Sequence, residues 1–164
     1  MKFAEEYKVV LMASALNWAS AGTNSTDSIN MENFHHATFL IDCGTMGAGN
    51  GTLFLYSGAT TGAETTAETF NYSYGGATAI YGGYVANHDV LAAQTAAASL
   101  LVLQATYPNY LLVLEIDASD ITDGQPWLTL DFKDDVGGNP TGLVSVMAIL
   151  EPRYSKVSSL SALV

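Results

Sequence analysis

The feature that most constrains the fold is a series of short apolar runs, each closed by glycine, proline, asparagine or aspartate after roughly ten residues. Phe70, Tyr72 and Tyr74 recur at a period of two, which is the period of a β-strand and not of a helix. Residues 143–150 (LVSVMAIL) end before Pro152, which lacks a backbone donor. Since no helical pattern is sustained, the sequence predicts an all-β fold. We expect an antiparallel, jelly-roll-like β-sandwich with long loops and at most one short helix.

Further strands are expected where β-branched, aromatic and leucine residues gather, at residues 7–12, 34–43, 52–57, 110–116 and 127–132. The glycine-rich segment 44–51 (GTMGAGNG) ends in Asn50-Gly51, a strong hairpin turn signal. The strands on either side of it are therefore predicted to pair as a β-hairpin.

Three segments interrupt this pattern. Residues 19–30 are rich in small polar side chains and are predicted to form a loop. Gly75-Gly76 is interpreted as a β-bulge. Residues 90–104 begin with alanines, which favour helix, and end with leucines and a valine, which suit a strand. We expect a turn or short helix there, followed by a strand.

The length of 164 residues fits one domain over residues 1–164, because two domains of half that size would each bury too small a core. Residues 1–30 and 155–164 are the candidates for extended arms. Val9 to Leu16 is apolar, but Glu5 and Glu6 stand where a secretion signal would be basic, so we expect no cleaved signal.

Charged residues make up only 13% of the chain while hydrophobic residues make up 49%, so much of the surface is expected to be neutral. Charge-poor surfaces promote association, which favours a protein covered by partners, including other copies of itself. The net charge of −11 and the five scattered bases argue against binding to nucleic acid or to an anionic membrane.

No pattern of catalytic or metal-ligating residues emerges. Cys43 is the only cysteine and is interpreted as a buried thiol. His35 and His36 point to opposite faces of a strand, and the third histidine, His88, has only Asp89 beside it, so neither place supplies a zinc cage. The aspartates of residues 117–123 and 131–135 lack the spacing of a calcium loop and suit solvated turns. We expect no enzyme activity, no cofactor and no metal. A hydrolase on a sandwich scaffold stays open as an alternative, and it would need two acids in a cleft.

Four tyrosines flanked by glycine admit two interpretations: Tyr72, Tyr74, Tyr81 and Tyr84. They form either a strand face in the domain's own core or an aromatic surface for a sugar or protein partner.

The C-terminal half carries a recognisable succession of motifs. Residues 112–121 read LVLEIDASDI, residues 127–130 WLTL, residues 145–150 SVMAIL and residues 151–154 EPRY. With Met31 to His35 and Phe39 to Gly44, these strings resemble small structural proteins encoded in tailed-phage head-gene clusters, beside the major capsid protein. The resemblance covers residues 30–164. The sequence departs from the family pattern in its alanine-rich residues 90–99 and at Ile121, where leucine is usual.

The resemblance implies a cement or decoration protein on the capsid exterior of the virion, a jelly-roll structural protein that bridges neighbouring major capsid protein subunits. The family has no catalytic residues to carry over. Arg153 and Tyr154 are of the types enriched at interface anchors, so they join the four tyrosines as interface candidates. The alternative is a carbohydrate-binding or receptor-binding β-sandwich of a head fibre, with the tyrosines as its platform.

Overall fold

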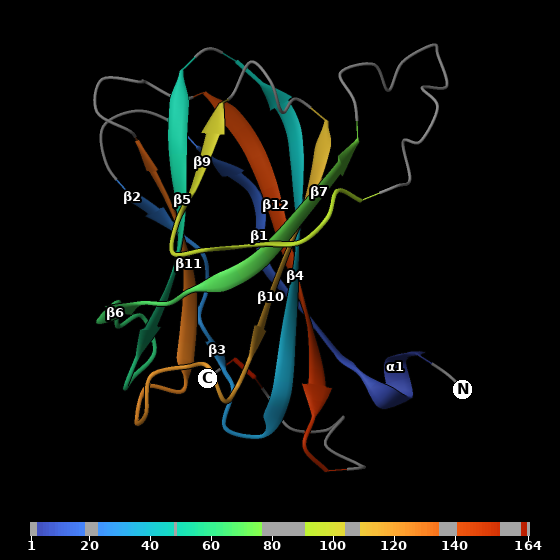
Figure 1. Cartoon of the computed structure of the whole chain (residues 1–164), viewed down its shortest axis with the longest axis vertical. Coiled ribbons are helices and arrows are strands. Elements are labelled where there is room, and N and C mark those ends of the chain that lie inside the picture. Colours follow the sequence, from blue (N-terminus) through green and yellow to red (C-terminus); the bar gives the residue numbers. More distant parts are fainter. Residues whose placement is uncertain are drawn as a thin grey trace.

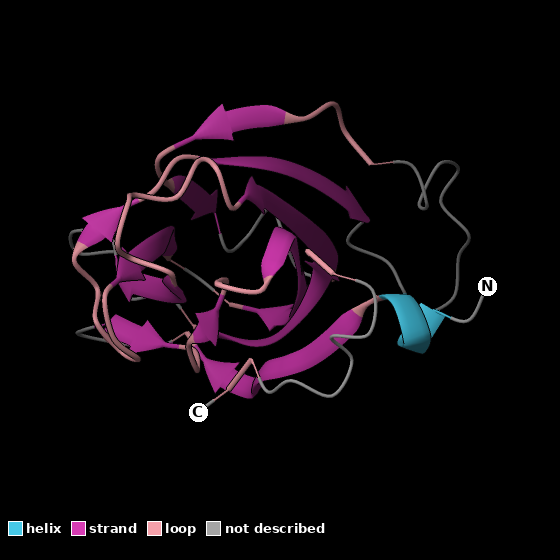
Figure 2. Cartoon of the chain, turned by 90° about the horizontal axis from the view of Figure 1, so that it is seen from below, coloured by secondary structure: helices cyan, strands magenta, loops and turns pink. Residues whose placement is uncertain are grey.

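The computed structural model describes residues 3–18, 23–47, 49–76, 91–103, 109–134, 141–154 and 162–163. In these residues two antiparallel sheets pack face to face, and the strands run along the long axis of the molecule (Figure 1). Seen along that axis, the sheets form two curved layers, and the single-turn helix α1 (Phe3–Glu6) lies outside them (Figure 2). The predicted all-β sandwich is confirmed.

One sheet, called sheet A, has the strand order β1-β12-β4-β10-β7-β8. Its strands are β1 (Lys8–Asn17), β12 (Gly142–Pro152), β4 (Phe34–Met46), β10 (Tyr110–Asp117), β7 (Phe70–Gly76) and β8 (Thr95–Ala97). The second sheet, called sheet B, has the path β2-β11-β5-β6, with β3 also paired to β11 and β9 also paired to β5. Its strands are β2 (Thr23–Ser25), β11 (Trp127–Asp134), β5 (Asn50–Gly58), β6 (Thr66–Ala67), β3 (Ile29–Asn30) and β9 (Leu100–Leu103).

The order of the strands is that of a jelly roll. When β1, β2, β4, β5, β9, β10, β11 and β12 are counted from one to eight along the chain, sheet A reads 1-8-3-6 and sheet B reads 2-7-4-5. Most strands that follow one another in sequence therefore lie in opposite sheets. β7 and β8 extend sheet A beyond β10.

The predicted hairpin around Asn50-Gly51 is wrong, because β4 lies in sheet A and β5 in sheet B. Asn50 and Gly51 belong to β5 itself, and the positive φ of 103° falls on Gly49. Gly51 is a glycine for a different reason: a Cβ there would lie 2.3 Å from Nε1 of Trp18. The glycine serves close packing and not a turn.

Three further segments were predicted from the sequence: a turn or short helix before a strand, a loop and a β-bulge. The strand expected at the end of residues 90–104 is confirmed as β9. The described part of this segment contains no helix, because its alanines pair with β7 as the edge strand β8. Short strands β2 and β3 occupy the predicted loop 19–30 because they pair with β11. Gly75 and Gly76 stay in register with β10, so the predicted bulge is wrong.

The proposed arms are partly placed. Residues 8–17 of the N-terminal one form the edge strand β1. Residues 155–161 lie outside the described residues, while Ala162 is buried and its carbonyl accepts a hydrogen bond from the Asn30 amide at 3.0 Å.

The core lies between the sheets and forms one hydrophobic cluster. Strand alternation explains its composition, because every second side chain points inward. From sheet A it receives Phe39 and Ile41, and from sheet B Leu130 and Phe132, all fully buried. Cys43 is also fully buried, and loss of hydration, followed by the neighbouring Asp42 charge, raises the pKa of its thiol to about 12.

Candidate interaction surface

The outer side of sheet A carries exposed apolar side chains on strands that are apolar on both faces. In β1, Val10 and Met12 point into the core, while Val9 and Leu11 point outward. Leu11 is 57% exposed. In β12, Val146 and Ala148 are buried and Met147, 40% exposed, points outward. A strand with one face in the core and the other in solvent would carry polar residues on the solvent side.

The register joins these side chains into a continuous patch. Leu11 pairs with Met147, Met147 with Leu40 of β4, and Val9 with Ile149. We call these five residues the apolar face. Leu40 in turn pairs with Val113 of β10, which is buried, so the exposed apolar row crosses the three neighbouring strands β1, β12 and β4. A contiguous exposed apolar patch on a folded protein marks a surface that associates.

Acidic residues border the apolar face. On β4, Asp42 lies two residues beyond Leu40 and is exposed. On the other side of the row, Glu115 of β10 pairs with Thr38. An apolar centre within a polar border is the usual anatomy of a protein–protein interface.

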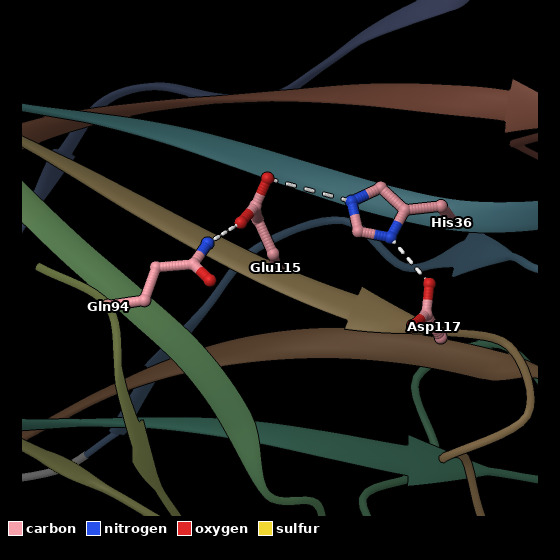
Figure 3. A network of polar contacts seen from close by, with 4 residues as sticks. All are labelled: His36, Gln94, Glu115 and Asp117. Atoms are coloured by element: carbon pink, nitrogen blue, oxygen red, sulfur yellow. Dashed lines mark hydrogen bonds and ion pairs between the residues drawn. The ribbon is translucent and has the colours of Figure 1, made fainter.

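His36 joins two acids on the same side of sheet A (Figure 3). Its Nδ1 lies 2.8 Å from Oδ1 of Asp117, and its Nε2 lies 3.7 Å from Oε1 of Glu115. Gln94 donates a hydrogen bond to the other oxygen of Glu115. The cluster links β4, β10 and the segment before β8, and each member has a partner, so it acts as a polar clamp between strands.

The predicted tyrosine surface is only partly described. Tyr72 pairs with Leu114 on the inner side of β7, and its ring packs edge-on against Phe70 at 6.4 Å. Tyr74, 36% exposed, has its ring centre 6.1 Å from that of Tyr110. Tyr81 and Tyr84 lie outside the described residues, as does His88. Tyr72 therefore contributes to the domain's own packing.

Arg153 and Tyr154 follow β12 and differ in their surroundings. The Nε of Arg153 donates a hydrogen bond to the Phe34 carbonyl at 2.9 Å, so part of this side chain secures the chain turn. Tyr154 is 70% exposed. Arg153 also borders an open pocket of about 270 Å³, together with Met31, Ile121 and Pro126.

A second pocket, of about 310 Å³, has acids in its lining: Glu68, Glu115 and Asp120. Glu68 accepts hydrogen bonds from the Ser57 hydroxyl and from the Thr122 amide at 2.9 Å. Glu115 is held by Gln94 and His36. Two of the three carboxylates are thus engaged in contacts that fix strands and loops.

Among the described residues, no group of three or more histidine, cysteine, aspartate or glutamate side chains is placed to hold a metal ion. Within the same residues, no helix is both long and apolar enough to cross a membrane.

The apolar face was not identified from the sequence. It requires the register of β1, β12 and β4, which are far apart along the chain. One signal was present: residues 9–12 and 146–150 are apolar without alternation, which is unusual for strands with a solvated face.

No protein-family model matches the chain, and no curated protein matches it. Among solved structures, the chain is similar to the SPBc2 prophage-derived protein YomS, with 12% sequence identity and a TM-score of 0.43. The likeness covers 88% of this chain and 92% of that one. A likeness of this size assigns neither a family nor a function.

Proposed function

We propose that this chain is a non-enzymatic decoration protein of a tailed-phage capsid, which binds the capsid exterior and bridges neighbouring major capsid protein subunits. The proposal rests on the resemblance of residues 30–164 to proteins of phage head-gene clusters. The observation that carries it is the apolar face of sheet A, because a cement protein needs a rigid contact area and no turnover.

The energetics favour this use of the surface. Leu11 is the most exposed member of the apolar face, Val9 and Met147 follow, and docking would remove apolar surface of each from water. Burying such side chains contributes about 25 cal/mol per Å². The apolar face contains no charged side chain, so docking through its centre avoids the cost of dehydrating charges. The acids at the border of the apolar face would set the orientation of the protein on the capsid surface.

The test is binding of the purified protein to particles assembled from the major capsid protein of a tailed phage. Leu11→Asp places a charge on the most exposed side chain of the apolar face, on the edge strand β1. We expect it to lower particle occupancy at least about tenfold, since a tenfold loss needs only about 1.4 kcal/mol. Thr23→Asp adds the same charge to an exposed strand position of sheet B and serves as the matched control.

Both variants should keep the thermal transition of the parent protein, because both positions are exposed. Wild-type occupancy by Leu11→Asp, or an equal loss in Thr23→Asp, would contradict docking through this face. A protein that never binds particles in a fixed copy ratio would remove the proposal altogether.

Tyr154 offers a second probe of the same role. Its side chain is mostly in solvent, so Tyr154→Ala should leave the fold unaffected and weaken particle binding if the end of β12 belongs to the interface. Arg153→Ala is less informative, because it also removes the hydrogen bond to the Phe34 carbonyl.

A further inference from the structure

The loop between β5 and β6, residues 59–65, lies across the outer side of sheet B, and we call it the strap. β6 pairs with one edge of β5, while β11 occupies the other edge of β5. The strap nevertheless reaches the segment beyond β11: the Gly62 amide donates to Ser28 Oγ at 2.9 Å, and the Ser25 hydroxyl donates to Glu64 Oε1 at 2.9 Å. Such contacts require the strap to pass over β11.

Two glycines permit this close approach. A Cβ at Gly58 would lie 2.1 Å from the carbonyl oxygen of Ala63, so only glycine allows the strap to fold back on β5. Gly62 has a φ of +72°, a conformation that residues with a side chain rarely adopt. The Thr65 amide then donates to the Ser57 carbonyl at 2.8 Å, which closes the loop.

Under the strap lies Asp131 of β11, a side chain on the outer side of its sheet that is nevertheless 0% exposed. Neither of its carboxylate oxygens accepts a hydrogen bond within the described residues. The nearby Ser25 hydroxyl has one proton, and it is donated to Glu64. A buried carboxylate without a donor is costly, and this one has Lys133 Nζ 3.4 Å from Oδ2 as its only ion-pair partner among those residues.

The charged and titratable groups that face Asp131 come from three elements. Lys133 lies on the same strand, Tyr56 on β5 binds Lys133 through its hydroxyl at 2.8 Å, and Glu64 lies on the strap. β2 contributes only the Ser25 hydroxyl. Within the described residues, Asp131 thus faces one cation, which is shared with a tyrosine, and one further carboxylate.

We propose that a proton shared between Asp131 and Glu64 fastens the strap to sheet B, and that loss of this proton releases the strap. When Asp131 is protonated, its hydroxyl becomes the donor that the site lacks and can bond Glu64. When both acids are ionised, two carboxylates oppose each other under the strap. The device is a pH-sensitive latch, independent of the role of sheet A.

The pH range over which the latch opens follows from the surroundings of Asp131. Burial is the main cause that raises its pKa, to about 6, and the Glu64 carboxylate adds to the shift. Contact with Ser25 and the charge of Lys133 oppose it. The latch is therefore fastened in mildly acidic solution and released as the pH rises above about 6.

Hydrogen exchange of the full chain tests the latch. The amides of Gly62 and Thr65 report on the strap, and exchange rates are corrected for the intrinsic effect of pH. Between about pH 5 and about pH 8 we expect the wild-type protein to lose roughly tenfold in strap protection, since two pKa units could supply at most about 100-fold. Glu64→Gln should abolish this pH dependence, and Glu6→Gln, at an exposed position in α1, should keep it.

Asp131→Asn is the second variant, because its amide can donate to Glu64 at any pH, and it should hold the strap closed across the range. Unchanged wild-type protection between the two pH values would overturn the proposal. Wild-type pH dependence in Glu64→Gln would overturn it too. Recovery of protection at about pH 8 on adding calcium chloride would replace the proton by a cation as the fastening group.

Discussion

Gly51 lies directly against the indole of Trp18, and this contact joins the two sheets. Trp18 follows β1 of sheet A, whereas Gly51 belongs to β5 of sheet B. The indole is buried, its Nε1 donates a hydrogen bond to the Lys133 carbonyl at 3.2 Å, and its ring packs edge-on against Phe132 at 4.8 Å. A residue with any side chain at position 51 would occupy the place of the indole.

Gly51→Ala is therefore expected to destabilise the fold by about 1–3 kcal/mol, the usual cost of overpacking a core. Chemical denaturation followed by tryptophan fluorescence measures the change in the free energy of unfolding. Asn50→Ala, at the neighbouring exposed position, should change it by less than about 0.5 kcal/mol. Equal stability of the two variants would show that the indole can move aside at no cost.

The same contact shows how far the sequence could be interpreted. The alternation of β7 and the apolar runs of β10 and β12 identified strands correctly, because strand formation depends on local patterns. Asn50-Gly51 was misassigned because a glycine required for packing against a distant residue looks the same in sequence as a glycine required by a turn.

The surfaces were harder to predict for a related reason. The apolar face depends on which strands lie side by side, and β1 and β12 are separated by most of the chain. The strap depends on a loop that contacts Ser25 and Ser28 more than thirty residues away. Single-sequence patterns contain no information on such pairings.

The Cys43 thiol should be unreactive in the folded protein. Only a thiolate attacks disulfide reagents, and burial raises the pKa of this thiol to about 12. A disulfide reagent at about pH 8 should therefore label the native protein only on the timescale of unfolding, and should label the protein at once in denaturant. Rapid labelling of the native protein would mean that the strand carrying Cys43 opens locally.

The clamp formed by His36 should contribute little but measurably to stability. His36 and Asp117 lie 2.8 Å apart and both are partly in solvent, so their coupling is expected to be at most about 1 kcal/mol. A double-mutant cycle with His36→Ala and Asp117→Ala measures it in low salt and again in about 1 M sodium chloride, where screening should reduce it. A coupling insensitive to salt would point to packing and not to charge.

Asp131 should give the whole protein a distinctive dependence of stability on pH. Its pKa is raised in the folded state from an ordinary value of 3.8 to about 6, so the folded state holds this proton more tightly than the unfolded state. The resulting stabilisation is fully present below about pH 3.8 and is lost as the pH rises through about 6.

Asp131→Asn removes this titration and leaves the other fifteen acids in place. The free energy of unfolding of the wild-type protein, minus that of the variant, should therefore fall between about pH 4 and pH 7 and stay constant above that range. Urea denaturation at a series of pH values measures this difference, with Asn50→Ala, which removes no titratable group, as the control. A difference for Asp131→Asn that rises with pH would mean that Lys133 outweighs burial and Glu64, and that Asp131 is held as a carboxylate in the folded protein.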